Sequence, residues 1–106
     1  MEDIVVNSPR DVLVNIIMKA LGTGMKTRKR WSGRDEIFFG GRVSAFVYDA
    51  AQIAHLMYGV QFESTRHDLI RKVKFIRQDW PLEDLTDASK VGNEATTIVS
   101  QILQEV

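Results

Sequence analysis

The stretch AAQIAHLMYGVQFESTRHDLIRKVKFIR, residues 50–77, gives the strongest indication of the fold and function of the chain. Its first half is rich in alanine and carries apolar residues at helical spacing. Its second half repeats that spacing and adds several arginines and lysines. Gly59 lies between the halves, where a glycine readily ends a helix. The sequence therefore predicts two helices with a short connection, the second of them basic on its exposed side.

The bounds of this pair follow from the apolar pattern and from residues that start or stop helices. The first helix is expected from Val43 to Gly59, with its apolar stripe formed by Val43, Phe46, Val47, Ala50, Ala54 and Met57. The second is expected to begin at Ser64 as N-cap and to end before Pro81, because proline has no N–H to donate. Its apolar stripe consists of Leu69, Ile70, Val73 and Ile76.

Two further helices are predicted towards the ends of the chain. Ser8, followed by a proline and an aspartate, is a favourable start for a helix over residues 9–21, which Gly22 ends. Thr86 or Asp87 starts a last helix, whose narrow apolar stripe consists of Val91, Ala95, Ile98, Val99, Ile102, Leu103 and Val106. We expect both helices to complete the core and one of them to supply a dimer interface.

The segment KTRKRWSGRDEIFFGG, residues 26–41, is the least regular part of the chain. A turn signal at Ser32-Gly33 is compatible with a short β-hairpin that pairs residues 27–31 with residues 34–39. A basic loop is the alternative.

Length and composition predict the fold class and compartment. A chain of 106 residues, 44% of them apolar, is the size of a single domain, so we expect one mainly α domain of four helices over residues 1–106. The absence of cysteine excludes disulfides and thiolate metal sites. The longest apolar stretch, residues 12–21, is about half the length of a membrane span. A soluble, cytoplasmic protein is the expectation.

The charges are unevenly distributed along a chain whose net charge is zero. Residues 26–77 contain eleven Lys or Arg and five acidic residues, whereas the two ends together contain three and nine. Such an asymmetry indicates a basic working surface on a domain with acidic ends.

Residues 53–69 resemble the helix-turn-helix of bacterial and phage transcription regulators. The resemblance rests on Ala54, the turn Tyr58-Gly59-Val60, and Thr65-Arg66, with one residue more than usual between the alanine and the glycine. It implies a helix-turn-helix or winged-helix-like unit whose second helix enters the major groove of double-stranded DNA. It also implies a small phage- or plasmid-type transcriptional regulator that acts as a homodimer.

The residue types support contact with DNA, because arginine pairs with guanine edges and lysine neutralises phosphates. We expect base contacts from Arg66 and His67, and phosphate contacts from the second helix and from the basic run. The candidates are Arg28, Lys29, Arg30, Arg34, Ser64, Thr65, Arg66, His67, Arg71, Lys74 and Arg77.

Some sequence features suggest functions other than double-stranded DNA binding. Trp31, Phe38 and Phe39 lie near arginines and could stack on single-stranded nucleic acid. The two histidines lack the spacing of a metal site, and no motif of catalysis or cofactor binding is present, so neither an enzyme nor a cofactor is expected. The main alternative is a small adaptor or inhibitor that docks on another protein through the apolar stripe of its last helix.

Overall fold

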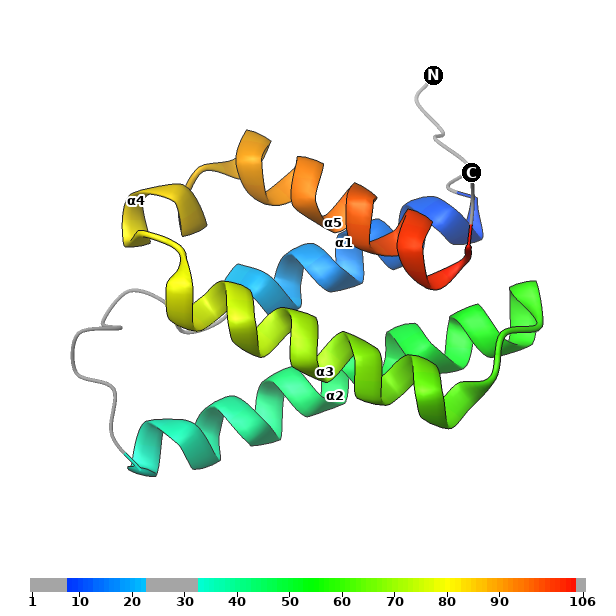
Figure 1. Ribbon diagram of the computed structural model, residues 1–106, viewed down its shortest axis with the longest axis horizontal. Coiled ribbons are helices and arrows are strands. Elements are labelled where there is room, and N and C mark those ends of the chain that lie inside the picture. The colour runs from blue at the N-terminus through cyan, green and yellow to red at the C-terminus, as the bar shows by residue number, and fades with distance from the viewer. Residues whose placement is uncertain (1–7, 23–32, 105–106) are drawn as a thin grey trace, which may run out of the picture.

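The computed structural model describes residues 8–22 and 33–104, and this part of the chain is mainly α, as predicted (Figure 1). Its helices are α1 (Pro9–Gly22), α2 (Gly33–Tyr58), α3 (Phe62–Asp79), the short α4 (Leu82–Leu85) and α5 (Ala88–Ile102). The described residues thus form five helices where the sequence predicted four, because the turn that follows Pro81 closes into α4. Among residues 8–22 and 33–104, no helix is long and apolar enough to cross a membrane.

The first helix starts as its sequence predicts. The backbone N–H of Asp11 donates to Ser8 Oγ at 3.2 Å, and the backbone N–H of Ser8 donates to Asp11 Oδ2 at 3.4 Å. This reciprocal pair satisfies N–H groups that the first turn of a helix leaves without a backbone partner.

Helix α2 begins at Gly33, ten residues before the expected start at Val43. The predicted β-hairpin is therefore wrong over residues 34–39, which are helical, while residues 27–31 lie outside the described part. The glycines at 40 and 41 each cost about 1 kcal/mol in a helix relative to alanine, which weakens the helix without ending it.

The connection between α2 and α3 is short and tightly bonded. Gly59 has a φ of +76°, and His55 Nδ1 lies 2.7 Å from the carbonyl oxygen of Val60. Gln61 Oε1 accepts a hydrogen bond of 2.7 Å from the backbone N–H of Ser64, so Gln61 is the N-cap. Helix α3 therefore begins at Phe62 and not after Ser64, because a glutamine side chain takes the role expected of the serine.

We predict that Gly59→Ala lowers the free energy of unfolding by about 1 kcal/mol, since a Cβ atom is strained at positive φ even though open space surrounds this glycine. Gly22→Ala is the matched control, because Gly22 also lies in open space but without positive φ. That control should be neutral or stabilising by roughly 0.5 kcal/mol. Urea titrations followed by circular dichroism measure both, and equal midpoints for the two variants would contradict the prediction.

One apolar core joins the helices, and α1 lies between α2 and α5 (Figure 1). The fully buried residues include Leu13 and Ile17 of α1, Val47 of α2 and Leu69 of α3. The apolar stripe of α5 is buried on α1, where Val91, Ala95, Ile98, Val99 and Ile102 are almost inaccessible to solvent.

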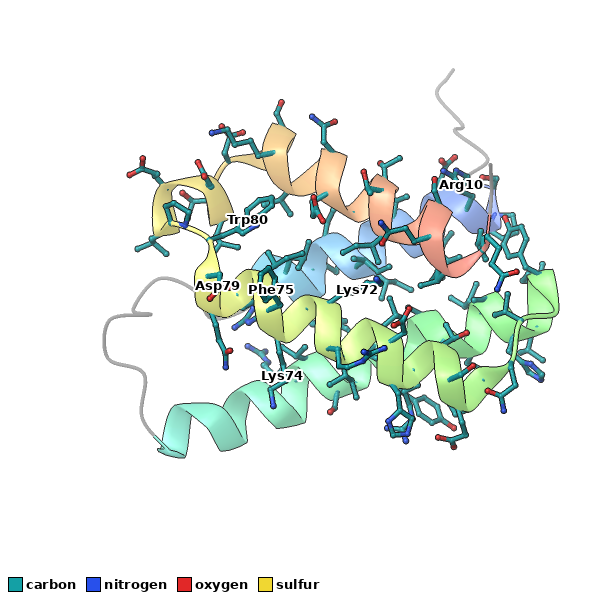
Figure 2. The ribbon with its side chains drawn as sticks, viewed as in Figure 1. Arg10, Lys72, Lys74, Phe75, Asp79 and Trp80 are labelled. Atoms are coloured by element: carbon teal, nitrogen blue, oxygen red, sulfur yellow. The ribbon has the colours of Figure 1, made fainter. Side chains whose placement is uncertain are left out.

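Polar contacts complete the packing of α5. Arg10 Nη2 of α1, labelled in Figure 2, donates to Ser100 Oγ of α5 at 2.7 Å. Asp87 Oδ1 accepts from the backbone N–H groups of Ser89 and Lys90, which confirms Asp87 as the N-cap. The stripe of α5 thus belongs to the core of the domain, so it is not open to the protein partner that the adaptor alternative would dock there.

Candidate nucleic-acid interface

The exposed side of α3 carries an uninterrupted row of polar residues. One side of this helix is buried, including Leu69, Val73 and Ile76. The opposite side consists of exposed residues that follow one another at intervals of three and four, which places them on one face of a helix. We call this row the outer stripe: Ser64, His67, Arg71, Lys74 and Gln78.

Lys74 and Lys72 lie on different sides of α3. In Figure 2, Lys74 projects towards α2, whereas Lys72 and Phe75 lie on the side towards α5. Asp68, Arg71, Lys72 and Phe75 line a shallow hollow of about 310 Å³ on that second side. The positive groups of α3 are thus distributed around the exposed side of the helix and are not gathered at one end.

Acidic neighbours accompany several of these positive groups. Arg66 Nη2 lies 3.0 Å from Glu63 Oε1, and Asp68 pairs with Arg71 and, at 3.9 Å, with Lys72. Lys74 forms no ion pair with any residue that the structure describes. Ion pairs at an exposed surface contribute only about 0–1 kcal/mol, so a phosphate could replace the carboxylate at little cost. Arg71 is the most accessible of these ion-paired residues, with 77% of its side chain exposed.

Arg77 is not available for DNA, although the sequence made it a candidate. It is 2% exposed, and its Nη1 donates to the backbone oxygens of Ala20 at 2.9 Å and Leu21 at 3.1 Å. Burial lowers the pKa of Arg77 to about 10, so its guanidinium remains charged at neutral pH. It satisfies carbonyls in the last turn of α1, which a helix leaves without intrahelical partners.

The remaining sequence candidates fall into three groups. Thr65 is buried beneath the outer stripe, which corrects its assignment to the DNA surface, and Arg66 lies beside the stripe with about a third of its side chain exposed. Arg34 belongs to the first turn of α2. Arg28, Lys29 and Arg30 lie outside the described residues, as does Trp31 of the proposed stacking surface.

The arrangement of α2 and α3 differs from the one expected from the resemblance. The two helices run in opposite directions side by side, joined by three residues, which makes them an αα-hairpin (Figure 1). The helices of a helix-turn-helix instead cross steeply, and the N-terminal residues of the second helix lead into the groove. The resemblance is thus confined to the sequence of the turn, and the whole length of α3 is exposed along one side.

The exposed apolar side chains of α2 form a second surface feature, which the sequence pattern does not predict. Tyr48, Leu56, Met57 and Tyr58 are large apolar side chains that α2 leaves exposed. Met57 was assigned to the buried stripe of α2, yet it is 60% exposed because α2 ends one residue later, beyond the elements that cover the stripe. The sequence does contain one indication of this exposed surface, because Tyr48 and Leu56 do not belong to the predicted apolar stripe of the helix.

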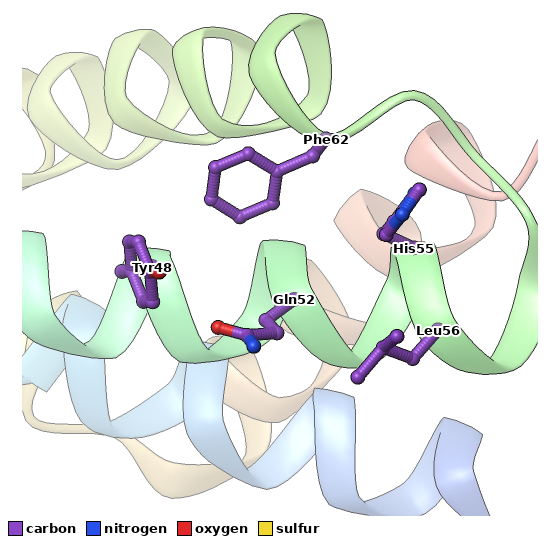
Figure 3. Close-up of a pocket in the computed structure, with 5 residues that line it drawn as sticks. All are labelled: Tyr48, Gln52, His55, Leu56 and Phe62. Atoms are coloured by element: carbon purple, nitrogen blue, oxygen red, sulfur yellow. The ribbon is translucent and has the colours of Figure 1, made fainter.

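Part of this apolar surface borders a hollow of about 300 Å³. Tyr48, Gln52, His55, Leu56 and Phe62 line it (Figure 3). The rings of Tyr48 and Phe62 meet edge to face, with centroids 5.2 Å apart, so this wall is held in place by a contact between α2 and α3.

No family model matches the chain, and no curated protein or solved structure matches it.

Proposed function

We propose that the protein binds double-stranded DNA with the outer stripe of α3, as a homodimeric regulator of transcription. The observation that carries the proposal is the stripe itself, which is exposed along its length, contains two permanent positive charges and includes no acidic residue. Its other members can donate or accept hydrogen bonds. This is the composition that both base edges and phosphates require.

The dimensions of the stripe suit a groove of DNA. Ser64 and Gln78 are fourteen residues apart, which corresponds to about 21 Å along an α-helix. The major groove is about 12 Å wide and admits an α-helix. Arg71 occupies the middle of the stripe, where its guanidinium could reach the edge of a guanine with two hydrogen bonds. Lys74 lies one turn further on and would neutralise a phosphate.

The direct experiment is fluorescence anisotropy of a labelled random duplex, titrated with the protein between about 50 and 200 mM salt. We expect affinity to fall steeply as salt rises, with a log–log slope near −2 or steeper for each copy, because Arg71 and Lys74 each release about 0.9 counterion. A single-stranded probe of the same sequence distinguishes groove binding from stacking on aromatic residues. Absence of binding at the lowest salt concentration would refute the proposal.

Docking on another protein is the second candidate function. It is favoured by Leu56 and Met57, which are 68% and 60% exposed although burial of such side chains stabilises a protein by about 1.5–3 kcal/mol each. This candidate predicts no affinity for either DNA probe. The same titration therefore separates the two functions.

A further inference from the structure

One large aromatic side chain of α3 is exposed beside the outer stripe. Phe75 is 61% exposed, and it is the only exposed large apolar side chain of α3, a helix whose residues are all described. Phe75 borders the hollow of about 310 Å³ that Asp68, Arg71 and Lys72 also line. The outer stripe does not include Phe75, so the proposed function gives this ring no role.

Phe75 lies between positively charged side chains. At about 100° per residue, the order around α3 is Lys74, Arg71, Phe75 and Lys72, at intervals of about 60°, 40° and 60°. Figure 2 agrees with this order, since Lys74 projects towards α2 whereas Lys72 and Phe75 lie on the side towards α5. A negatively charged partner would therefore be attracted on both sides of the ring.

This charge pattern favours DNA over an apolar protein surface as the partner of Phe75. Three cations lie within four residues of the ring, so a purely apolar partner would remove water from these charges without compensation. DNA offers phosphates along its backbone and base edges within the groove. The carboxylate of Asp68 repels phosphate from the hollow itself, so a base edge and not the backbone faces Phe75.

Thymine is the base whose major-groove edge suits an exposed phenylalanine. It carries a C5-methyl group there, and phenylalanine is one of the side chains that contact this methyl group. Arg71 and Phe75 are four residues apart, which corresponds to about 6 Å along an α-helix. Because successive bases of one strand are about 3.4 Å apart, the contacts of these two side chains fall within about two base pairs.

We propose that Phe75 is a specificity-determining residue that contacts the methyl group of a thymine close to the guanine bound by Arg71. This inference rests on the proposed function and names the class of sequence that α3 recognises, a guanine with a thymine within two base pairs. Lys72 and Lys74 would neutralise phosphates on the two sides of the groove.

Replacing thymine by uracil tests this contact, because the two bases differ only in the methyl group. A duplex is selected from a random library with the wild-type protein and is then prepared in a thymine and a uracil version. We expect the wild type to bind the uracil duplex about fourfold more weakly, as the loss of one buried methyl group predicts. Phe75→Ala should bind both versions with equal affinity. Anisotropy titrations measure all four affinities.

The outcomes of these titrations separate the two proposals. A wild-type protein that binds the thymine and uracil duplexes equally, or selected duplexes that share no thymine, would overturn the role of Phe75 and leave DNA binding intact. Absence of binding to any duplex would instead refute the proposed function itself.

Two further variants control for the loss of an exposed apolar side chain and for the kind of contact. Leu56→Ala truncates a side chain of α2 that is 68% exposed, and it should discriminate between the two duplexes as the wild type does. Phe75→Leu keeps an apolar contact with the methyl group and should keep most of the discrimination. Tighter binding of a single-stranded probe, lost in both Phe75→Leu and Phe75→Ala, would show that the ring stacks on unpaired bases and would contradict the proposal.

The fold of Phe75→Ala is checked by urea unfolding followed by circular dichroism. Its midpoint should equal that of the wild type, because the ring is exposed. A loss of discrimination at an unchanged midpoint then reports the contact with DNA.

Discussion

Replacing Arg77 by alanine is expected to lower the free energy of unfolding by about 2–4 kcal/mol. The substitution removes both hydrogen bonds from Arg77 Nη1 and leaves the carbonyls of Ala20 and Leu21 buried without these donors. It also opens a cavity, because Arg77 is the largest of the fully buried side chains among the described residues. This loss of stability is partly offset, because the alanine variant no longer pays the desolvation cost of a buried guanidinium.

Urea unfolding monitored by circular dichroism measures this effect. Arg77→Met, which keeps most of the volume but no donor, should fall between the wild type and alanine. Arg71→Ala is the matched control on the same helix, and its stability should change by no more than about 0.5 kcal/mol because the side chain is exposed. An Arg77→Ala protein with the midpoint of the wild type would show that this contact does not hold α1 to α3.

The second large effect is expected on DNA affinity. Arg71→Ala combined with Lys74→Ala should weaken binding to every duplex by at least about 100-fold, since each charge-assisted hydrogen bond to a phosphate contributes about 1.5–3 kcal/mol. The salt dependence should become shallower by about two units of slope per copy. Anisotropy titrations at several salt concentrations measure both quantities.

The control for this variant must remove the same charge elsewhere. Lys19→Ala with Lys90→Ala meets that condition, because both lysines are exposed and lie on α1 and α5, away from the outer stripe. This control should keep most of the wild-type affinity. If the α3 variant and the control bind equally, the net charge of the protein matters and α3 is not the DNA surface.

The sequence predicted most of the helices because their local signals agree with their packing. Helices begin or end where capping chemistry and backbone geometry require it, at Ser8, Pro81 and Asp87. The start of α2 was not predicted because the turn signal at Ser32-Gly33 and the glycines at 40 and 41 disfavour a helix. These residues lower the stability of a helix but do not prevent one from forming. The start of α3 was missed because Gln61 caps it with a side chain that is rarely chosen for that role.

The candidate site was predictable only where helical periodicity determines exposure. His67, Arg71 and Lys74 follow from the apolar pattern of α3, since they lie opposite its buried side. The role of Arg77 depends on the end of α1, more than fifty residues earlier in the chain, and no local pattern reports such a contact. The exposed apolar side chains of α2 were not predicted for a related reason, because their exposure depends on which other helices leave them uncovered.

The short connection at Gly59 also has a consequence for the order of folding. Helices α2 and α3 are neighbours in the chain, so closing three residues between them costs little entropy, whereas α1 must find α5 across more than sixty intervening residues. We expect the α2–α3 hairpin to be largely formed in the folding transition state and α5 to dock afterwards. Conservative core substitutions test this order: Val73→Ala should slow folding, while Val99→Ala should mainly accelerate unfolding. The opposite pattern would place the nucleus between the two ends of the chain.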